Sequence, residues 1–179
     1  TRIEIQYNGE VAGLTVEPIS IAIIKGLLNR SIDGVNMVNA PFIAKERGVE
    51  IQESKSNEVH EYTSTVQVQV TTQNGTHRVT GSIFGKGDSR IVQLEEYSLE
   101  AVLSKNMLVL NNTDVPGVIG NLGNVLGKHN LNIAGFHLGR MEDGGKAVAI
   151  INIDGPPTQE TVQELRETAN IVNVHSVTL

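Results

Sequence analysis

The fold is decided by the stretch MLVLNNTDVPGVIGNLGNVLGKHNLNI, residues 107–133. It opens with an apolar run typical of a buried strand, passes through a turn that contains Pro116 and Gly117, and continues with apolar residues at helical spacing. The apolar helical positions are Val118, Ile119, Leu122, Val125 and Leu126. They share one helix face, so the stretch predicts a strand, a helix packed on a sheet, and a second strand.

The turn before this helix is the candidate binding site. A helix N-terminus leaves backbone amides unpaired and carries a partial positive charge, so it suits a small carboxylate. Asn112 and Asp114 precede the helix and Asn132 opens the next strand, where their side chains could contact the rest of such a ligand. In the alternative interpretation, Asp114 only caps the helix and the two asparagines only stabilise turns.

The remaining C-terminal sequence completes a recognisable order of elements. A Gly-Gly turn precedes an apolar strand at residues 147–153, Thr158 can cap a helix, and residues 171–179 form a last strand. Residues 105–179 therefore predict a ferredoxin-like βαββαβ domain. The apolar phase shifts between Ile133 and Ala134, which predicts a β-bulge beside the binding site.

Residues 1–104 predict a separate α+β domain. The chain opens inside a strand without an initiator Met, so we expect a fragment of a larger polypeptide. Pro18 introduces an apolar run that predicts a buried helix, with a strand as the alternative. Residues 35–38 are a short strand candidate. Residues 61–103 predict an antiparallel meander whose first turn is Asn74-Gly75.

Composition excludes several function classes. The chain has no Cys, which excludes disulfides, thiol catalysis and Cys-ligated metals. Its net charge of −6 argues against binding to nucleic acid or an anionic membrane. No signal peptide or membrane-length apolar run is present, so we expect a cytoplasmic protein. The five His residues show no metal-ligand spacing, and no catalytic constellation is recognisable, so we expect neither a metal nor catalytic residues in this segment.

Lys86 and Arg90 flank a glycine-bearing loop and are candidates for binding an anion such as phosphate or carboxylate. The alternative is that both are ordinary solvated basic side chains.

A family resemblance covers nearly the whole chain. The motif NTDVPGVIG at residues 112–120, followed by Asn132-Ile133, resembles the ACT regulatory domain of D-3-phosphoglycerate dehydrogenase. Residues 2–9, 35–41 and 81–85 resemble the intervening domain of the long form of that enzyme. The resemblance implies a non-catalytic regulatory region with no cofactor of its own. In that family an NAD-dependent catalytic part, which would precede Thr1, oxidises 3-phosphoglycerate in the first step of serine biosynthesis.

The same resemblance implies L-serine as feedback effector, with contacts at Asn112, Asp114, Asn132 and the backbone amides of Gly117 and Val118. It also implies side-by-side pairing of ACT domains in a dimer or tetramer. Asn112 and Asp114 replace residues found in some members, and Ser98 stands at a position that is commonly basic. The alternatives are another effector, a pure assembly module, or a module of another enzyme such as a serine dehydratase.

Overall fold

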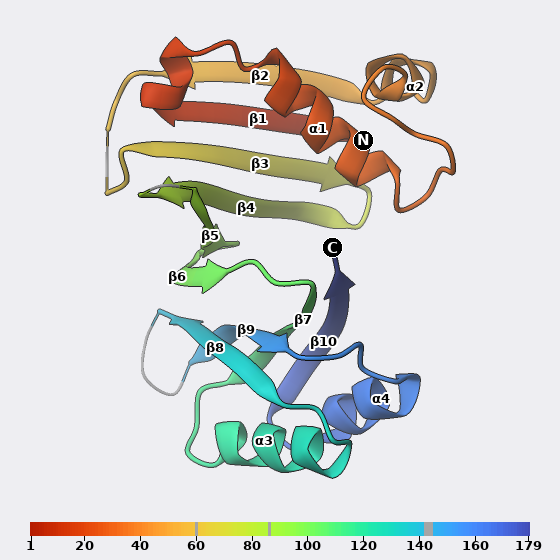
Figure 1. Cartoon of the computed structure of the whole chain (residues 1–179), viewed down its shortest axis with the longest axis vertical. Coiled ribbons are helices and arrows are strands. Elements are labelled where there is room, and N and C mark those ends of the chain that lie inside the picture. The colour runs from red at the N-terminus through yellow and green to blue at the C-terminus, as the bar shows by residue number, and fades with distance from the viewer. Residues whose placement is uncertain (60, 86, 142–144) are drawn as a thin grey trace. The chain divides into compact units, whose positions relative to one another are not determined.

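The computed structural model describes residues 1–59, 61–85, 87–141 and 145–179. The chain forms two compact units, Thr1–Ile83 and Phe84–Leu179 (Figure 1). Helices and sheets occur in both units, which confirms the predicted α+β class. The predicted domain boundary between residues 104 and 105 stays a prediction.

The first unit is a mixed sheet with helices packed on one face. Its elements are β1 (Arg2–Gly9), a 3-10 turn (Glu10–Gly13), α1 (Glu17–Leu28), α2 (Ala40–Glu46), β2 (Glu50–Ser56), β3 (Ser64–Thr72) and β4 (Gly75–Phe84). These strands lie in the order β2-β1-β3-β4, with β1 and β2 parallel and the other neighbours antiparallel. The β3–β4 hairpin turns at Asn74-Gly75, as predicted.

Helix α1 crosses the sheet over β1, where Ile3, Ile5 and Tyr7 alternate as buried residues (Figure 1). The Tyr7 hydroxyl lies 2.6 Å from Ser20 Oγ of α1, and burial raises the pKa of Tyr7. The helix is confirmed over the strand alternative, but the expectation of a buried helix is wrong, because only Ser20 and Ile24 of α1 are buried. Because the sheet covers only one side of α1, Leu27 on the other side stays 38% exposed.

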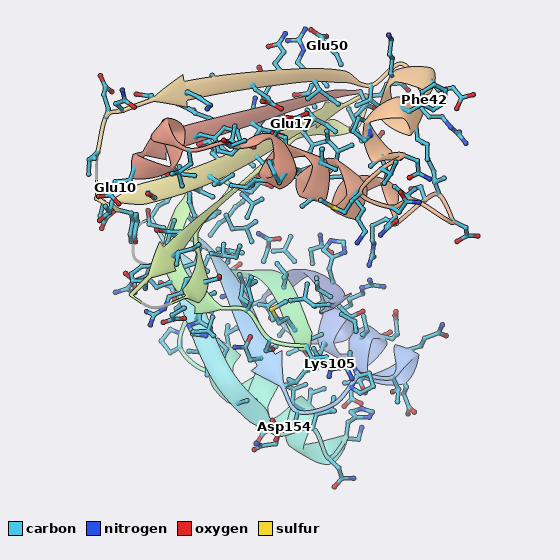
Figure 2. All side chains as sticks on the ribbon, turned by 45° about the horizontal axis from the view of Figure 1, so that its top comes forward. Glu10, Glu17, Phe42, Glu50, Lys105 and Asp154 are labelled. Atoms are coloured by element: carbon cyan, nitrogen blue, oxygen red, sulfur yellow. The ribbon has the colours of Figure 1, made fainter. Side chains whose placement is uncertain are left out.

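Residues 35–38 do not form the predicted strand. Asn36 Oδ1 accepts hydrogen bonds from the amides of Val38 (2.9 Å) and Asn39 (3.0 Å), and Asn39 Oδ1 accepts one from the Asn36 amide (2.7 Å). Side chains thus take the backbone donors that a sheet would need, and the segment turns into α2. Beyond it, Phe42 lies on the outer side of α2 and is 69% exposed (Figure 2).

The second unit contains the predicted βαββαβ order. Its elements are β5 (Asp88–Leu94), β6 (Tyr97–Val102), β7 (Asn106–Thr113), α3 (Val118–Lys128), β8 (Ile133–Arg140), β9 (Lys146–Ile153), α4 (Gln159–Glu167) and β10 (Ile171–Thr178). The last four strands form an antiparallel sheet in the order β10-β7-β9-β8. This order leaves β8 at one edge of the sheet.

The two faces of this sheet are covered differently. Helices α3 and α4 bury one face, where Leu110 of β7 packs with Leu122, Leu126 and Leu165. The antiparallel β5–β6 hairpin covers the other face, and its buried residues Leu99 and Ala101 join Met107 and Ile150. The sequence predicted this hairpin but not the surface on which it packs.

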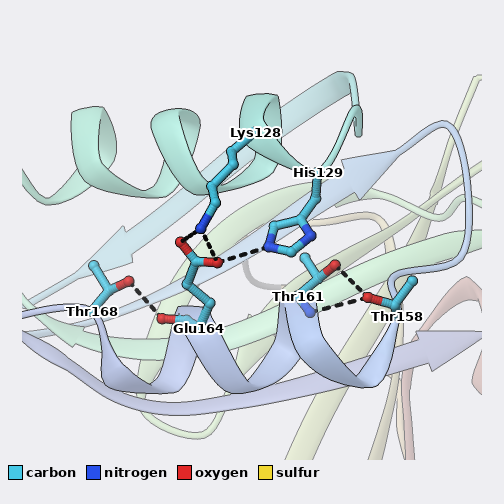
Figure 3. Close-up of polar contacts among 6 residues, drawn as sticks. All are labelled: Lys128, His129, Thr158, Thr161, Glu164 and Thr168. Atoms are coloured by element: carbon cyan, nitrogen blue, oxygen red, sulfur yellow. Dashed lines mark hydrogen bonds and ion pairs between the residues drawn. The ribbon is translucent and has the colours of Figure 1, made fainter.

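Thr158 caps α4 as predicted, because its Oγ1 accepts a hydrogen bond from the Thr161 amide at 3.1 Å (Figure 3). We expect Thr158→Ala to lower the free energy of unfolding by about 1 kcal/mol, the usual cost of losing such a cap. Urea denaturation followed by circular dichroism measures the change. The control is Gln159→Ala at the exposed neighbouring position, which should stay within about 0.5 kcal/mol of the wild type. Equal effects of the two substitutions would contradict the assignment.

Glu164 of α4 joins the C-terminal end of α3 to α4 (Figure 3). Its carboxylate accepts hydrogen bonds from Lys128 Nζ at 2.8 and 2.9 Å, and its Oε2 lies 2.8 Å from His129 Nε2. The hydrogen bond from Lys128 and then that from His129 lower the pKa of Glu164. The pairing therefore stabilises the fold only while Glu164 is ionised.

We expect this cluster to give a small pH-dependent stabilisation. A lowered folded-state pKa means that the stabilisation is complete above the ordinary carboxyl value of 4.5 and is lost as the pH falls through the lower folded value. Glu164→Gln should therefore melt slightly below the wild type at neutral pH, and the difference should close in acid. Thermal melts across this range test it, with Glu46→Gln on α2 as a charge-matched control. A difference that is constant with pH would contradict the prediction.

Candidate functional site

A cavity of about 510 Å³ lies where β7 ends, α3 begins and β8 ends. Its lining is Asn112, Asp114, Val115, Pro116, Gly117, Val118, Ile119, Leu122, Phe136, Leu138 and Arg140. Most of this surface is apolar, and the polar side chains that line it are an amide, a carboxylate and a guanidinium. Such a site can hold a small ligand with both an apolar part and charged groups.

Four of the predicted residues meet at this cavity. Leu108 and Leu110 of β7 face the helices, and Asn112 continues the same row as a polar residue that is 4% exposed. Its Nδ2 donates to the Thr113 carbonyl at 2.9 Å. Gly117 and Val118 lie at the start of α3 on the same cavity. An amide side chain and a helix N-terminus therefore face one small volume.

The alternative that Asp114 caps α3 is wrong. The N-cap residue is Gly117, whose φ of 95° places it in the left-handed region, and α3 begins at Val118. Gly117 has no side chain, so it offers no side-chain acceptor to the first helical amides. Asp114 lies in the preceding turn, where its Oδ2 accepts a hydrogen bond from Arg140 Nη1 at 3.3 Å.

Sequence reasoning missed Arg140, which ends β8 and lines the cavity. Its side chain is 56% exposed, against 21% for Asp114. The βαββαβ order contains the signal that could have found it. The first two strands of that order run parallel, so their C-terminal residues lie at the same end of the sheet.

Asn132 lies at the other end of the sheet from Asn112 and Asp114. Strands β7 and β8 are each antiparallel to β9, so they run parallel to each other. Asn112 is near the end of β7, whereas Asn132 directly precedes β8. Asn132 is not part of the cavity lining, and its Nδ2 donates to Asp154 Oδ2 at 2.8 Å. One copy of the chain thus does not bring Asn132 to a ligand in the cavity.

The predicted bulge is present in β8. The register with β9 shifts between the pairs Ile133–Ile153 and Gly135–Asn152, so Ala134 is the extra residue. The bulge lies at the Asn132 end of β8, away from the Arg140 end that lines the cavity. The bulge therefore lies next to Asn132, one of the predicted site residues, and not next to the cavity.

Of the two candidates for anion binding, Lys86 lies outside the described residues and Arg90 lies within them. Arg90 donates from Nη2 to Asp88 at 2.6 Å and from Nη1 to Glu100 at 3.0 Å. Its guanidinium also lies 4.6 Å from the centre of the Phe84 ring. The hydrogen bond to Asp88 is the largest cause of a raised Arg90 pKa. An external anion would have to compete with both carboxylates, so anion binding by Lys86 and Arg90 stays a prediction.

Across residues 1–59, 61–85, 87–141 and 145–179, no three His, Asp or Glu side chains form a group that could hold a metal ion. No helix in those ranges is long and apolar enough to cross a membrane.

The ferredoxin-like sheet, with a cavity at the first helix, defines a regulatory module of the ACT class. The ACT domain model matches residues 106–170, and the model of the D-3-phosphoglycerate dehydrogenase intervening domain matches residues 1–95. The chain belongs to the D-3-phosphoglycerate dehydrogenase intervening-domain family and carries an ACT domain after that domain.

Curated relatives agree with this assignment. The chain is 33% identical to D-3-phosphoglycerate dehydrogenase of Synechocystis over 99% of its own length and 32% of the relative. It is 33% identical to the Bacillus subtilis protein of that name and 32% identical to the Archaeoglobus fulgidus protein, in both cases over 99% of its length and 34% of the relative. The chain thus spans about a third of the length of these relatives.

Proposed function

We propose that the chain is the regulatory and oligomerisation region of a D-3-phosphoglycerate dehydrogenase and that its ACT domain binds L-serine as a feedback effector. The observation that carries the proposal is the cavity at the N-terminus of α3, which combines an apolar wall with Asn112, Asp114 and Arg140. NAD and 3-phosphoglycerate would bind to another part of the enzyme. The dehydrogenase names and the greater length of the relatives support that part of the proposal.

The cavity offers a partner for each charged group of an amino acid. The carboxylate can accept hydrogen bonds from the first amides of α3, where Gly117 leaves them without a capping side chain. Arg140 can add a charge-assisted hydrogen bond to the same carboxylate. Asp114 is an acceptor suited to the ammonium group.

Two copies of the chain would complete the site. Strand β8 is an edge strand, and an edge presents unpaired backbone groups that can pair with another strand. If two copies pair antiparallel through β8 about a two-fold axis, the Asn132 end of one copy faces the Arg140 end of the other. Asn132 then contacts a ligand in the neighbouring cavity. The exposed Ile119, at 54%, lines that cavity and would be covered in the same dimer.

Regulation then follows from a difference in affinity. Serine bound between two copies favours the arrangement of subunits in which both halves of the site meet. The coupling free energy of such effects is typically about 1–3 kcal/mol. The intervening domain would pass this preference to the catalytic part as a rigid-body shift.

Isothermal titration of the chain with L-serine tests the proposal. We expect binding by the wild type and a loss of affinity of about tenfold or more in Asn132→Ala, which removes a hydrogen bond to a charged group. Sedimentation of both proteins checks that each is folded and associated. A folded, associated wild type that does not bind L-serine would overturn the effector assignment and leave an assembly module.

A further inference from the structure

The Asn132 side chain is held in one orientation by Asp154, the residue that follows β9. Asp154 is labelled in Figure 2. Asn132 Nδ2 donates to Asp154 Oδ2 at 2.8 Å, and the Asp154 amide donates to the Asn132 carbonyl at 3.2 Å. The bulge at Ala134 sets the register in which Ile133 pairs with Ile153. Asn132 and Asp154, the residues adjacent to this pair, therefore lie next to each other. Both backbone and side chain therefore connect Asn132 to Asp154.

This contact decides which polar atom Asn132 offers to a ligand. The oxygen and nitrogen of an amide side chain are assigned from their hydrogen bonds. An ionised carboxylate only accepts hydrogen bonds, so the atom of Asn132 that faces Asp154 must be Nδ2. The other atom, Oδ1, makes no hydrogen bond to the part of the chain that the structure describes. Asn132 is exposed, and what it presents to its surroundings is a hydrogen-bond acceptor.

We infer that Asp154 is a positioning residue that makes Asn132 a receptor for the ammonium group of the effector. The inference rests on the proposed function and adds how the amino acid is oriented in the site. The carboxylate faces the α3 N-terminus and Arg140 of one copy, and the ammonium lies between Asp114 of that copy and Asn132 Oδ1 of the other. An ammonium has three donors, so it can serve both acceptors.

The inference predicts a specific response to Asp154→Asn. The new amide can donate to Asn132 Oδ1, which lets Asn132 turn over and point its own N–H groups at the ligand. L-serine should then bind about tenfold more weakly, because the N–H groups of Asn132 would face the ammonium, which is itself a donor and cannot accept a hydrogen bond. Glycerate, which carries a hydroxyl in place of the ammonium, can accept a hydrogen bond as well as donate one. Its affinity should stay within about twofold of the wild-type value.

The first measurement needs no ligand. In a nitrogen–proton NMR spectrum, the side-chain amide pair of Asn132 is identified by its loss in Asn132→Ala. We expect this pair to move in Asp154→Ala and Asp154→Asn, and to stay in place in Asp33→Asn, which makes the same charge change on an exposed residue of the first unit. An unchanged pair in both Asp154 variants overturns the inference, whether or not serine binds.

The second measurement is titration of the same variants with L-serine and with glycerate. A selective loss of serine affinity in Asp154→Asn supports the inference, whereas equal losses for both ligands or no loss overturn it. A wild type that binds neither ligand refutes the proposed function, and it also refutes the recognition of an ammonium by Asn132. In that case the NMR result alone decides whether Asp154 orients Asn132.

Discussion

The substitution Gly9→Ala is expected to lower the free energy of unfolding of the first unit by about 2–6 kcal/mol. Gly9 ends β1 with a φ of 77° and a ψ of −144°, a region that residues with a side chain rarely occupy. That backbone strain costs about 1–3 kcal/mol. An added Cβ would also lie 2.0 Å from the Thr63 carbonyl oxygen, a contact that forces the backbone apart. Overpacking of this kind costs about 1–3 kcal/mol more.

The clash would also disturb a hydrogen bond, because the same Thr63 oxygen accepts the Glu10 amide at 3.1 Å. Denaturation by urea, followed by circular dichroism, measures the loss. Gly26→Ala is the matched control, since Gly26 lies inside α1 and, apart from the nearby backbone of α1 itself, no atom of the described residues lies within 4 Å of the new methyl group. Ala is the better helix former by about 1 kcal/mol, so this control should stabilise the same unit. Shifts of the same sign for both variants would contradict the prediction.

Residue patterns predicted those elements whose apolar spacing is regular. In α3, Val118, Leu122 and Leu126 are buried as the spacing required, but Ile119 is 54% exposed. Ile119 lines the cavity at the start of α3, which local spacing does not reveal. The prediction of a strand at residues 35–38 was wrong for a different reason. The side chains of Asn36 and Asn39 accept hydrogen bonds from backbone amides that a strand would use for pairing.

The candidate site could be predicted where it is local in sequence. Asn112, Gly117 and Val118 lie close together in the sequence, from the end of β7 to the start of α3, and the structure places all three on one cavity. Arg140 joins them only through the parallel course of β7 and β8, a property of the sheet as a whole. The same course separates Asn132 from the cavity. The motif therefore predicted a group of residues of which the structure brings Asn112, Asp114, Gly117 and Val118 to one cavity, whereas Asn132 lies at the other end of the sheet.

Mixing two defective variants should restore L-serine binding, and this is the sharpest test of the two-copy site. Asp114→Asn damages the cavity half and Asn132→Ala damages the half contributed by the other copy. Each is expected to lower affinity about tenfold or more when measured alone. The hydrogen bonds of these two side chains go to Arg140 and Asp154, which are exposed enough to be solvated after the change. Both variants should therefore fold.

In an equal mixture after subunit exchange, half of the dimers contain one copy of each variant. One of the two sites in such a dimer combines the intact Asp114 of one copy with the intact Asn132 of the other. Titration should therefore detect wild-type affinity at about one quarter of the wild-type number of sites. If Asp114 and Asn132 of the same copy contacted one ligand, the mixture would contain no intact site. The absence of recovery, in a mixture shown by mass spectrometry to have exchanged subunits, would thus refute the shared site, and recovery requires that each bound serine contacts two copies of the chain.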